Sequence, residues 1–157
     1  MKNILFVASE CVPFVKTGGL ADVVGALPKS LDRSKYDVRV VLPDYACIPD
    51  KFRSQFRYIH HFYMDLGQLG NVYVGIMTYE LDGVTYYFID NEHYFNGEKP
   101  YGDIHWDIEK FCFFSKAALA ILPVIDFHPD VIHCHDWQTG VTPVFLHTLF
   151  KSNPFYH

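Results

Sequence analysis

The chain opens with an apolar run that leads through a pair of glycines into a helical pattern. Residues 4–8 are typical of a buried parallel strand. Gly18 and Gly19 allow backbone angles closed to other residues and let a ligand approach closely. The apolar residues that follow recur at helical spacing and predict one buried helix face, made of Leu20, Val23, Val24, Leu27 and Leu31. The opening therefore predicts a strand, a tight turn and a helix.

The turn between these two elements is suited to an anion. A helix N-terminus presents unpaired N–H groups and a partial positive charge, and phosphate is its usual ligand. Lys16 adds a full positive charge. A tight turn whose glycines serve only packing, beside a solvated lysine, explains the same residues equally well. The segment matches neither the Walker loop nor GxGxxG.

The next segments predict a largely parallel sheet with a hairpin. Residues 37–42 form a second strand, which completes a right-handed β-α-β unit. A strand is expected at 58–64. Residues 72–81 and 84–89 flank Asp82-Gly83, a favoured two-residue turn, and predict a β-hairpin.

The second half of the chain continues the alternation of helices and strands. A long helix is expected over 107–122 and a buried strand over 130–134. Thr139 is the expected N-cap of a last helix that has Pro143 in its first turn. A short helix is expected around 51–56 and a loop at 91–103. The helix over 107–122 is expected to bury 108, 111, 112, 115, 118, 119 and 122. The inner face of the last helix is expected at 141, 144, 145, 148 and 149.

Composition bounds the class of protein. The 157 residues are 50% hydrophobic, which suits one globular domain. The formal net charge of -5 disfavours nucleic-acid binding, and no apolar run is long enough to cross a membrane. No signal-peptide pattern precedes the first strand. The four cysteines form no CxxC pair, so we expect reduced thiols and a cytoplasmic protein.

A second polar motif follows the expected strand at 130–134. In open α/β sheets, ligands bind outside the carboxyl ends of the strands, where His133-Cys-His-Asp136 falls. His133 and His135 alternate with Cys134, so they can face the same way. Zinc binding is a rival interpretation of this cluster. A hydrogen-bonded core histidine, with Asp136 capping the next helix, is another.

Three segments carry a resemblance to a known family. The string KTGGLADVVGALP at 16–28, FCFFSKAAL at 111–119 and HCHDW at 133–137 occur in the order found in bacterial glycogen synthases and plant starch synthases. The chain resembles this family along essentially its whole length.

The resemblance implies a fold and an activity. The expected fold is a Rossmann-like α/β domain with a mostly parallel sheet, flanking helices and a β-hairpin insertion. Residues 1–157 would form the N-terminal, acceptor-side half of a GT-B glycosyltransferase. The sheet looks truncated, because another strand is expected after the last helix. The implied enzyme transfers glucose from ADP-glucose, or UDP-glucose, to the non-reducing end of an α-1,4-glucan with retention. Neither a metal nor a cofactor is implied, and the nucleotide-sugar domain is absent.

The resemblance also implies roles for single residues. Lys16 and the backbone of Gly18 and Gly19 would meet the donor phosphate. His135 and Asp136 would act at the reacting sugars. The remaining expected substrate contacts are Asp22, Trp137, and one or both of Tyr94 and Phe95.

Two alternatives belong to other classes of protein. One is a glucan-binding module without catalytic activity. The other is a metal-dependent hydrolase built on the HCHD cluster at 133–136.

Overall fold

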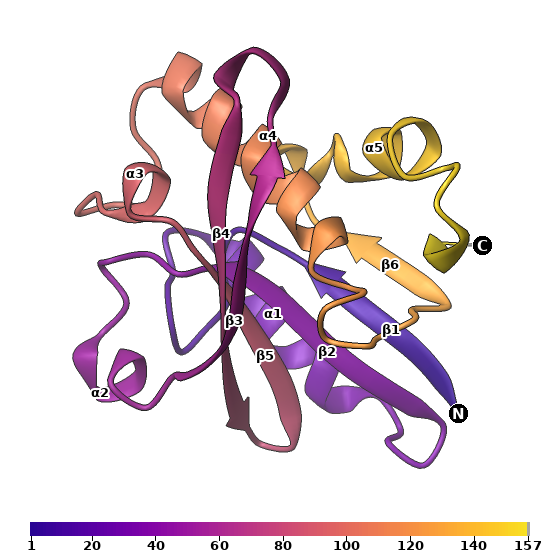
Figure 1. The fold of residues 1–157 in the computed structure, drawn as a ribbon. Coiled ribbons are helices and arrows are strands. Elements are labelled where there is room, and N and C mark those ends of the chain that lie inside the picture. Colours follow the sequence, from indigo (N-terminus) through magenta and orange to yellow (C-terminus); the bar gives the residue numbers. More distant parts are fainter. Residues whose placement is uncertain (157) are drawn as a thin grey trace.

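A six-stranded mixed sheet forms the centre of the computed structural model, which describes residues 1–156. The strand order is β3-β4-β5-β2-β1-β6 (Figure 1). The strands β6, β1, β2 and β5 run parallel, whereas β4 and β3 continue the sheet in antiparallel pairing. Their bounds are β1 Lys2–Val7, β2 Tyr36–Pro43, β3 Arg57–Asp65, β4 Asn71–Leu81, β5 Val84–Asp90 and β6 Val131–Cys134.

Helices cover both faces of this sheet. The helix α1 lies on one face, and α4 and α5 lie on the other (Figure 1). The α-helices are α1 Gly19–Ser30, α2 Asp50–Arg53, α3 Glu92–Phe95, α4 Ile104–Ala120 and α5 Thr142–Thr148, and the 3-10 turns are η1 Gly67–Leu69, η2 Trp137–Thr139 and η3 Pro154–Tyr156. The expected α/β layering is confirmed. The short helix α2 overlaps the helix that was expected around 51–56. The expected loop at 91–103 contains α3.

The hairpin is confirmed at the expected turn. Asp82 and Gly83 both have positive φ values, 51° and 72°, as the favoured two-residue hairpin turn requires. The flanking Leu81 and Val84 pair directly. Arg33, which follows α1, donates a hydrogen bond to the Asp82 carbonyl and ties the turn to the neighbouring β-α-β unit.

An aromatic cluster anchors the loop between β1 and α1. The Phe14 ring lies edge-on to Tyr86 and Phe88 on β5, at centroid distances of 4.9 and 5.1 Å. It also contacts Phe52 of α2 at 5.4 Å. Because Phe14 is buried, the loop that carries the glycine turn is attached to the core by a large apolar side chain.

The buried face of α1 differs from the expected one. Val23 is exposed, and the buried residues are Ala21, Val24, Gly25 and Pro28. A Cβ on Gly25 would lie 2.2 Å from Val12 Cγ2 and 2.9 Å from the Val12 carbonyl oxygen. The helix therefore packs through its smallest side chains against the loop that precedes it, and hydrophobic periodicity alone misses this close approach.

The helix α4 starts three residues before the expected position. The Asp103 side chain caps it by accepting hydrogen bonds from the amides of His105 and Trp106, at 3.0 and 3.2 Å. Ile108, expected on the buried face, is exposed, and Cys112 is only partly buried. Their place in the core is taken by larger aromatic residues such as Phe113 and Phe114, since α4 is enclosed on most of its circumference.

The last strand and helix also depart from expectation. The strand β6 is an edge strand with Val131 exposed, whereas a buried strand was expected. The N-cap of α5 is Val141. Thr139 lies in η2 instead, and its hydroxyl donates to the His135 carbonyl at 2.8 Å. Pro143 is in the first turn as expected, but 144, 148 and 149 of the expected inner face are exposed.

We expect Gly25→Ala to destabilise the chain by about 1–3 kcal/mol, because the added methyl group overpacks the contact with Val12. A glycine-to-alanine change in a helix otherwise stabilises it by up to about 1 kcal/mol. Urea unfolding of the two proteins measures the difference. Gly19→Ala is the control in the same helix, since its Cβ would meet no atom within 4 Å. Equal or greater stability of Gly25→Ala would contradict the close packing.

Candidate functional site

The β1–α1 loop is organised around a buried carboxylate that the sequence analysis missed. Glu10 is 3% exposed. It accepts hydrogen bonds from the Thr17 amide, from Thr17 Oγ1 at 2.8 Å and from the Gly18 amide at 3.3 Å. An acidic residue of this chain therefore occupies the Gly18 amide, one of the two backbone N–H groups that an external anion was expected to meet. No local sequence pattern marks Glu10, because its partners are recognisable only once the loop is folded.

The two glycines of the turn do not adopt angles that require glycine. Gly18 has φ −152° and ψ −164°, and Gly19 is not among the residues with positive φ. The expectation of unusual backbone angles is therefore wrong at both positions. A Cβ at either glycine would meet no atom within 4 Å, so both leave open space at the start of α1. Within residues 1–156, the amides of Gly19 and Leu20 have no protein acceptor.

Lys16 and Asp22 form an ion pair across the turn. Lys16 Nζ lies 2.7 Å from both carboxylate oxygens of Asp22, and the two side chains are 51% and 55% exposed. Exposed pairs of this kind contribute about 0–1 kcal/mol. The ammonium group can therefore exchange Asp22 for an incoming anion at small energetic cost.

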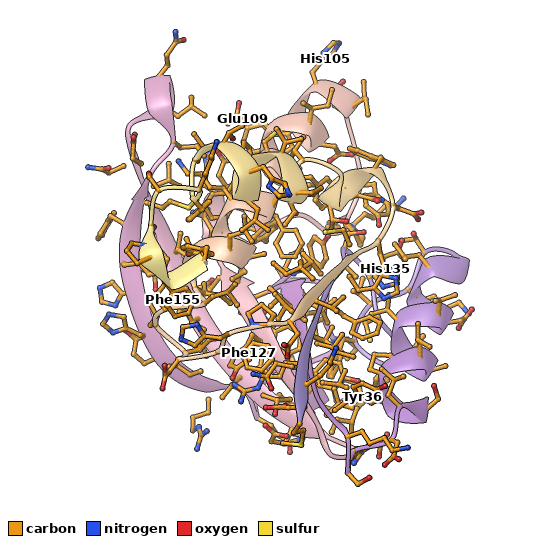
Figure 2. All side chains as sticks on the ribbon, turned by 90° about the vertical axis from the view of Figure 1, so that its right-hand side faces the viewer. Tyr36, His105, Glu109, Phe127, His135 and Phe155 are labelled. Carbon is orange, nitrogen blue, oxygen red and sulfur yellow. The ribbon has the colours of Figure 1, made fainter. Side chains whose placement is uncertain are left out.

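The two histidines of the second motif face the same way, as expected. Their ring centroids are 4.4 Å apart, and Phe6 of β1 lies 4.9 Å from His133 and 5.6 Å from His135. The His135 amide donates to the Val7 carbonyl at 3.1 Å and fixes the motif to the end of β1. Figure 2 shows His135 where the chain leaves β6, toward the side of the sheet that carries α1.

The imidazole of His135 is held in its neutral form. Burial lowers its pKa below 6.5, and the neighbouring His133 lowers it further, while Asp136 opposes both effects. His135 Nε2 is buried and has no hydrogen-bond partner among the described residues. The ring therefore has one buried nitrogen that lacks a hydrogen bond to the described residues.

Asp136 has a strained backbone. Its φ of 60° and ψ of −174° fall in a region populated almost only by glycine. The Thr139 hydroxyl holds this conformation through bonds to the carbonyls of His135, at 2.8 Å, and Asp136, at 3.3 Å. The Asp136 side chain makes no capping bond to η2, so the interpretation of Asp136 as a simple cap is wrong. Such strain is concentrated at functional sites.

Trp137 is the exposed member of the second motif. Its side chain is 52% exposed, and its ring lies edge-on to Phe111 of α4 at 5.5 Å. Phe111 in turn lies 5.8 Å from the Tyr101 ring. One side of the indole therefore packs against Phe111, and the other side is exposed to solvent.

Tyr94 and Phe95 have different environments. Phe95 is 2% exposed and packs between Tyr45 and Phe113, at 5.5 and 6.0 Å. Tyr94 is 4% exposed, stacks on Phe113 at 4.7 Å and donates its hydroxyl to Glu109 Oε1 at 2.9 Å. Tyr94, and not Phe95, lines a surface hollow of about 640 Å³. Of this pair, only Tyr94 remains a candidate for substrate contact.

The hollow beside Tyr94 is acidic and aromatic. It lies between the β3–β4 ribbon, the carboxyl end of β5 and the start of α4, and no lysine or arginine lines it. Burial raises the pKa of Asp90 at its edge. Carboxylates and amides bind hydroxyl groups, carboxylates repel phosphate, and aromatic rings supply apolar area. The lining residues are Leu69, Asn71, Val72, Tyr73, Asp90, Asn91, Glu92, His93, Tyr94 and Glu109.

The expected site residues thus fall into two groups. The β1–α1 loop and the motif at 133–137 meet at the carboxyl end of β1, through the bond from His135 to Val7. Tyr94 lies apart from them in the acidic hollow. Within residues 1–156, no three or more His, Cys, Asp or Glu side chains are arranged to hold a metal ion. None of the helices described is long and apolar enough to span a membrane.

An α/β sheet whose polar motifs gather at the carboxyl end of its parallel strands defines a class of nucleotide- or sugar-binding domains. Residues 3–157 match the family model for the starch synthase catalytic domain. The chain belongs to this family.

Individual relatives agree with the family assignment. A glycogen synthase of Lachnoclostridium phytofermentans is 60% identical over 157 residues, which are 100% of this chain and 33% of that protein. A glycogen synthase of Lachnospira eligens is 60% identical over 156 residues, 99% of this chain and 32% of that protein. The chain therefore spans about a third of the length of the relatives it matches.

A solved structure agrees with the fold. The catalytic domain of starch synthase IV from Arabidopsis thaliana, bound to ADP and acarbose, superposes with a TM-score of 0.77 at 31% identity. The match covers 95% of this chain and 31% of that one. The expected fold class, a Rossmann-like α/β domain of the GT-B type, is confirmed.

We expect His135 to titrate below pH 6.5, and its pKa to rise in His133→Asn because one of the two lowering effects is removed. The ring-proton resonances of the histidines, followed against pH, measure both values. Between pH 6.5 and the lowered pKa, the unfolded chain binds more protons than the folded one, so stability falls as the pH drops through this window. A His135 pKa above 6.5 would contradict the burial of the ring.

Proposed function

We propose that the chain is the N-terminal, acceptor-side domain of a glycogen synthase, spanning residues 1–157. The enzyme transfers glucose from ADP-glucose to the non-reducing end of an α-1,4-glucan and retains the anomeric configuration. One observation carries the proposal: Lys16 and the open amides of Gly19 and Leu20 at the start of α1 follow β1, whose last residue accepts a hydrogen bond from the His133–Trp137 motif. The identity to glycogen synthases supports the same activity.

On the donor side, the β1–α1 loop binds the diphosphate. Lys16 leaves Asp22 and pairs with a phosphate oxygen, while the open amides of Gly19 and Leu20 point at the same group. As the bond between glucose C1 and the phosphate oxygen breaks, negative charge develops on the leaving diphosphate. A cation and a helix N-terminus already in place stabilise that charge. Since the Gly18 amide is bonded to Glu10, Gly18 contributes open space instead of a donor.

At the reacting sugars, the strained motif positions hydroxyl groups. His135 accepts a hydrogen bond at its neutral Nε2, and Asp136 accepts through its carboxylate, so that the glucose being transferred is held for attack by the acceptor hydroxyl. Trp137 offers its exposed face for stacking against a sugar ring.

On the acceptor side, the glucan lies along the acidic hollow. A glucan is a neutral chain of hydroxyl groups, and the lining of carboxylates, amides and aromatic rings matches that chemistry. Tyr94 and Glu109 form one wall of the hollow through their mutual hydrogen bond. Because no lysine or arginine lines the hollow, it does not attract the negatively charged nucleotide sugar, which binds at the β1–α1 loop instead.

The rest of the enzyme supplies the remaining contacts to the donor. The base of the donor contacts a C-terminal domain of the same protein, and the ADP bound to the Arabidopsis relative favours ADP-glucose over UDP-glucose. Neither a metal nor an organic cofactor takes part in this scheme, because Lys16 and the helix amides supply the positive charge. We place the enzyme in the cytoplasm, where the four free cysteines stay reduced.

We expect Lys16→Ala in the full-length protein to lower glucose incorporation from ADP-glucose into glycogen by about 100-fold, since the leaving diphosphate loses its charge partner. Radiolabelled donor measures the rate. Lys35→Ala is the matched control, because Lys35 is an exposed lysine paired only with Asp32 at the far end of α1. The proposal is contradicted if the parent enzyme transfers no glucose. It is also contradicted if Lys16→Ala is as active as the control.

The 157-residue chain alone should transfer no glucose under the same conditions, because its contacts reach the phosphate and not the base of the donor. The same assay at matched molar concentration compares it with the full-length protein. Clear turnover by the isolated chain would show that one domain suffices.

A further inference from the structure

A buried polar network joins three segments that are distant in sequence. Tyr101 Oη lies 2.7 Å from Glu10 Oε1 and 2.7 Å from Ser9 Oγ. Glu10 in turn accepts from Thr17 and from the Gly18 amide. The end of β1, the glycine turn and the segment before α4 therefore share one set of hydrogen bonds. Ser9 and Glu10 are both buried, at 0% and 3% exposure.

The network fixes the position of the turn. A buried carboxylate is stable only when donors surround it, and here four donor groups converge on one side chain. Any movement of Thr17 or Gly18 away from Glu10 would leave this carboxylate buried with fewer partners. The loop between Lys16 and Gly19 is consequently held in one place, although its own side chains are exposed.

Glu10 also determines which amides near the glycine turn are free to bind a ligand. It occupies the Thr17 and Gly18 amides, and the Gly19 and Leu20 amides are left without a protein acceptor among the described residues. An anion at this turn must therefore bind at the first residues of α1.

The same network reaches the other polar surfaces of the domain. Tyr101 lies in the segment that connects α3, the wall of the acidic hollow, to α4. Its ring is 5.8 Å from Phe111, which supports Trp137 at 5.5 Å. A shift of Tyr101 is thus transmitted both to Glu10 and toward the exposed tryptophan.

We propose that Glu10 is a positioning residue, which holds the Lys16–Gly19 loop so that the donor phosphate binds at Lys16, Gly19 and Leu20, and that Tyr101 keeps Glu10 in place. This inference rests on the proposed function. Glu10 touches neither donor nor acceptor, and it acts through the backbone of Thr17 and Gly18.

The test is Glu10→Gln in the full-length protein, with kcat and KM measured separately for ADP-glucose and for glycogen. Glutamine preserves the volume of the side chain but removes its charge. We expect the KM for the donor to rise and kcat/KM for the donor to fall about 10- to 100-fold, the penalty for a binding group displaced by about 1 Å, with the KM for glycogen unchanged. Glu98→Gln, at an exposed glutamate for which no hydrogen bond is found among the described residues, is the control and should match the parent.

Hydrogen–deuterium exchange provides a readout that does not depend on turnover. The peptide that contains Thr17 and Gly18 should exchange two amides faster in Glu10→Gln than in the parent, because their acceptor is weakened. If the parent transfers no glucose, the proposed function fails, and this exchange measurement still decides the role of Glu10.

Several outcomes would overturn the inference. One is unchanged donor kinetics together with unchanged exchange in Glu10→Gln. Another is a fall in kcat with both KM values unchanged, which indicates only a smaller folded fraction. If Glu10→Gln does not fold, Thr17→Val replaces it, since Thr17 is exposed and loses only the bond from its hydroxyl. A severalfold rise in the KM for the donor supports positioning, and an unchanged KM refutes it.

Discussion

The parallel pairing of β1 with its two neighbours is the constraint on which the site depends. The strand β1 is bonded to β2 on one side and to β6 on the other, so the carboxyl ends of all three meet at one edge of the sheet. The histidine motif lies more than 100 residues after β1 in sequence, yet the bond from the His135 amide to the Val7 carbonyl fixes it to the end of β1, from which the β1–α1 loop starts. The roles proposed for Lys16, His135 and Asp136 all depend on this arrangement of strands.

Two buried side chains hold the β1–α1 loop against this edge by different physical means. Phe14 contributes apolar burial among the aromatic rings of β5 and α2. Glu10 contributes directional hydrogen bonds to Thr17 and Gly18. Burial fixes where the loop attaches, but it does not fix the direction of the amides, and the carboxylate supplies that direction. Together they give a surface loop a defined shape without a ligand.

Periodicity and turn chemistry predicted most of the fold. The strands, the hairpin at Asp82-Gly83 and the long helix follow from local patterns, whereas the order of the strands in the sheet was not predicted. The errors arise where tertiary contacts override the pattern: α1 turns its glycine face inward, and β6 is an exposed edge. Of the candidate site, Lys16 and His135 are visible in sequence, but Glu10 is not, because its partner Tyr101 is 91 residues away.

The ion pair between Lys16 and Asp22 also sets which anions can bind at the turn. A small anion that arrives alone must replace a carboxylate of the same sign that is permanently tethered six residues away. That exchange yields little net energy, so free phosphate is a poor competitor. A phosphate attached to a sugar and a nucleotide is delivered by its other contacts at high effective concentration. Under the proposed function, the pair therefore favours a phosphate that brings further contacts over a free inorganic anion.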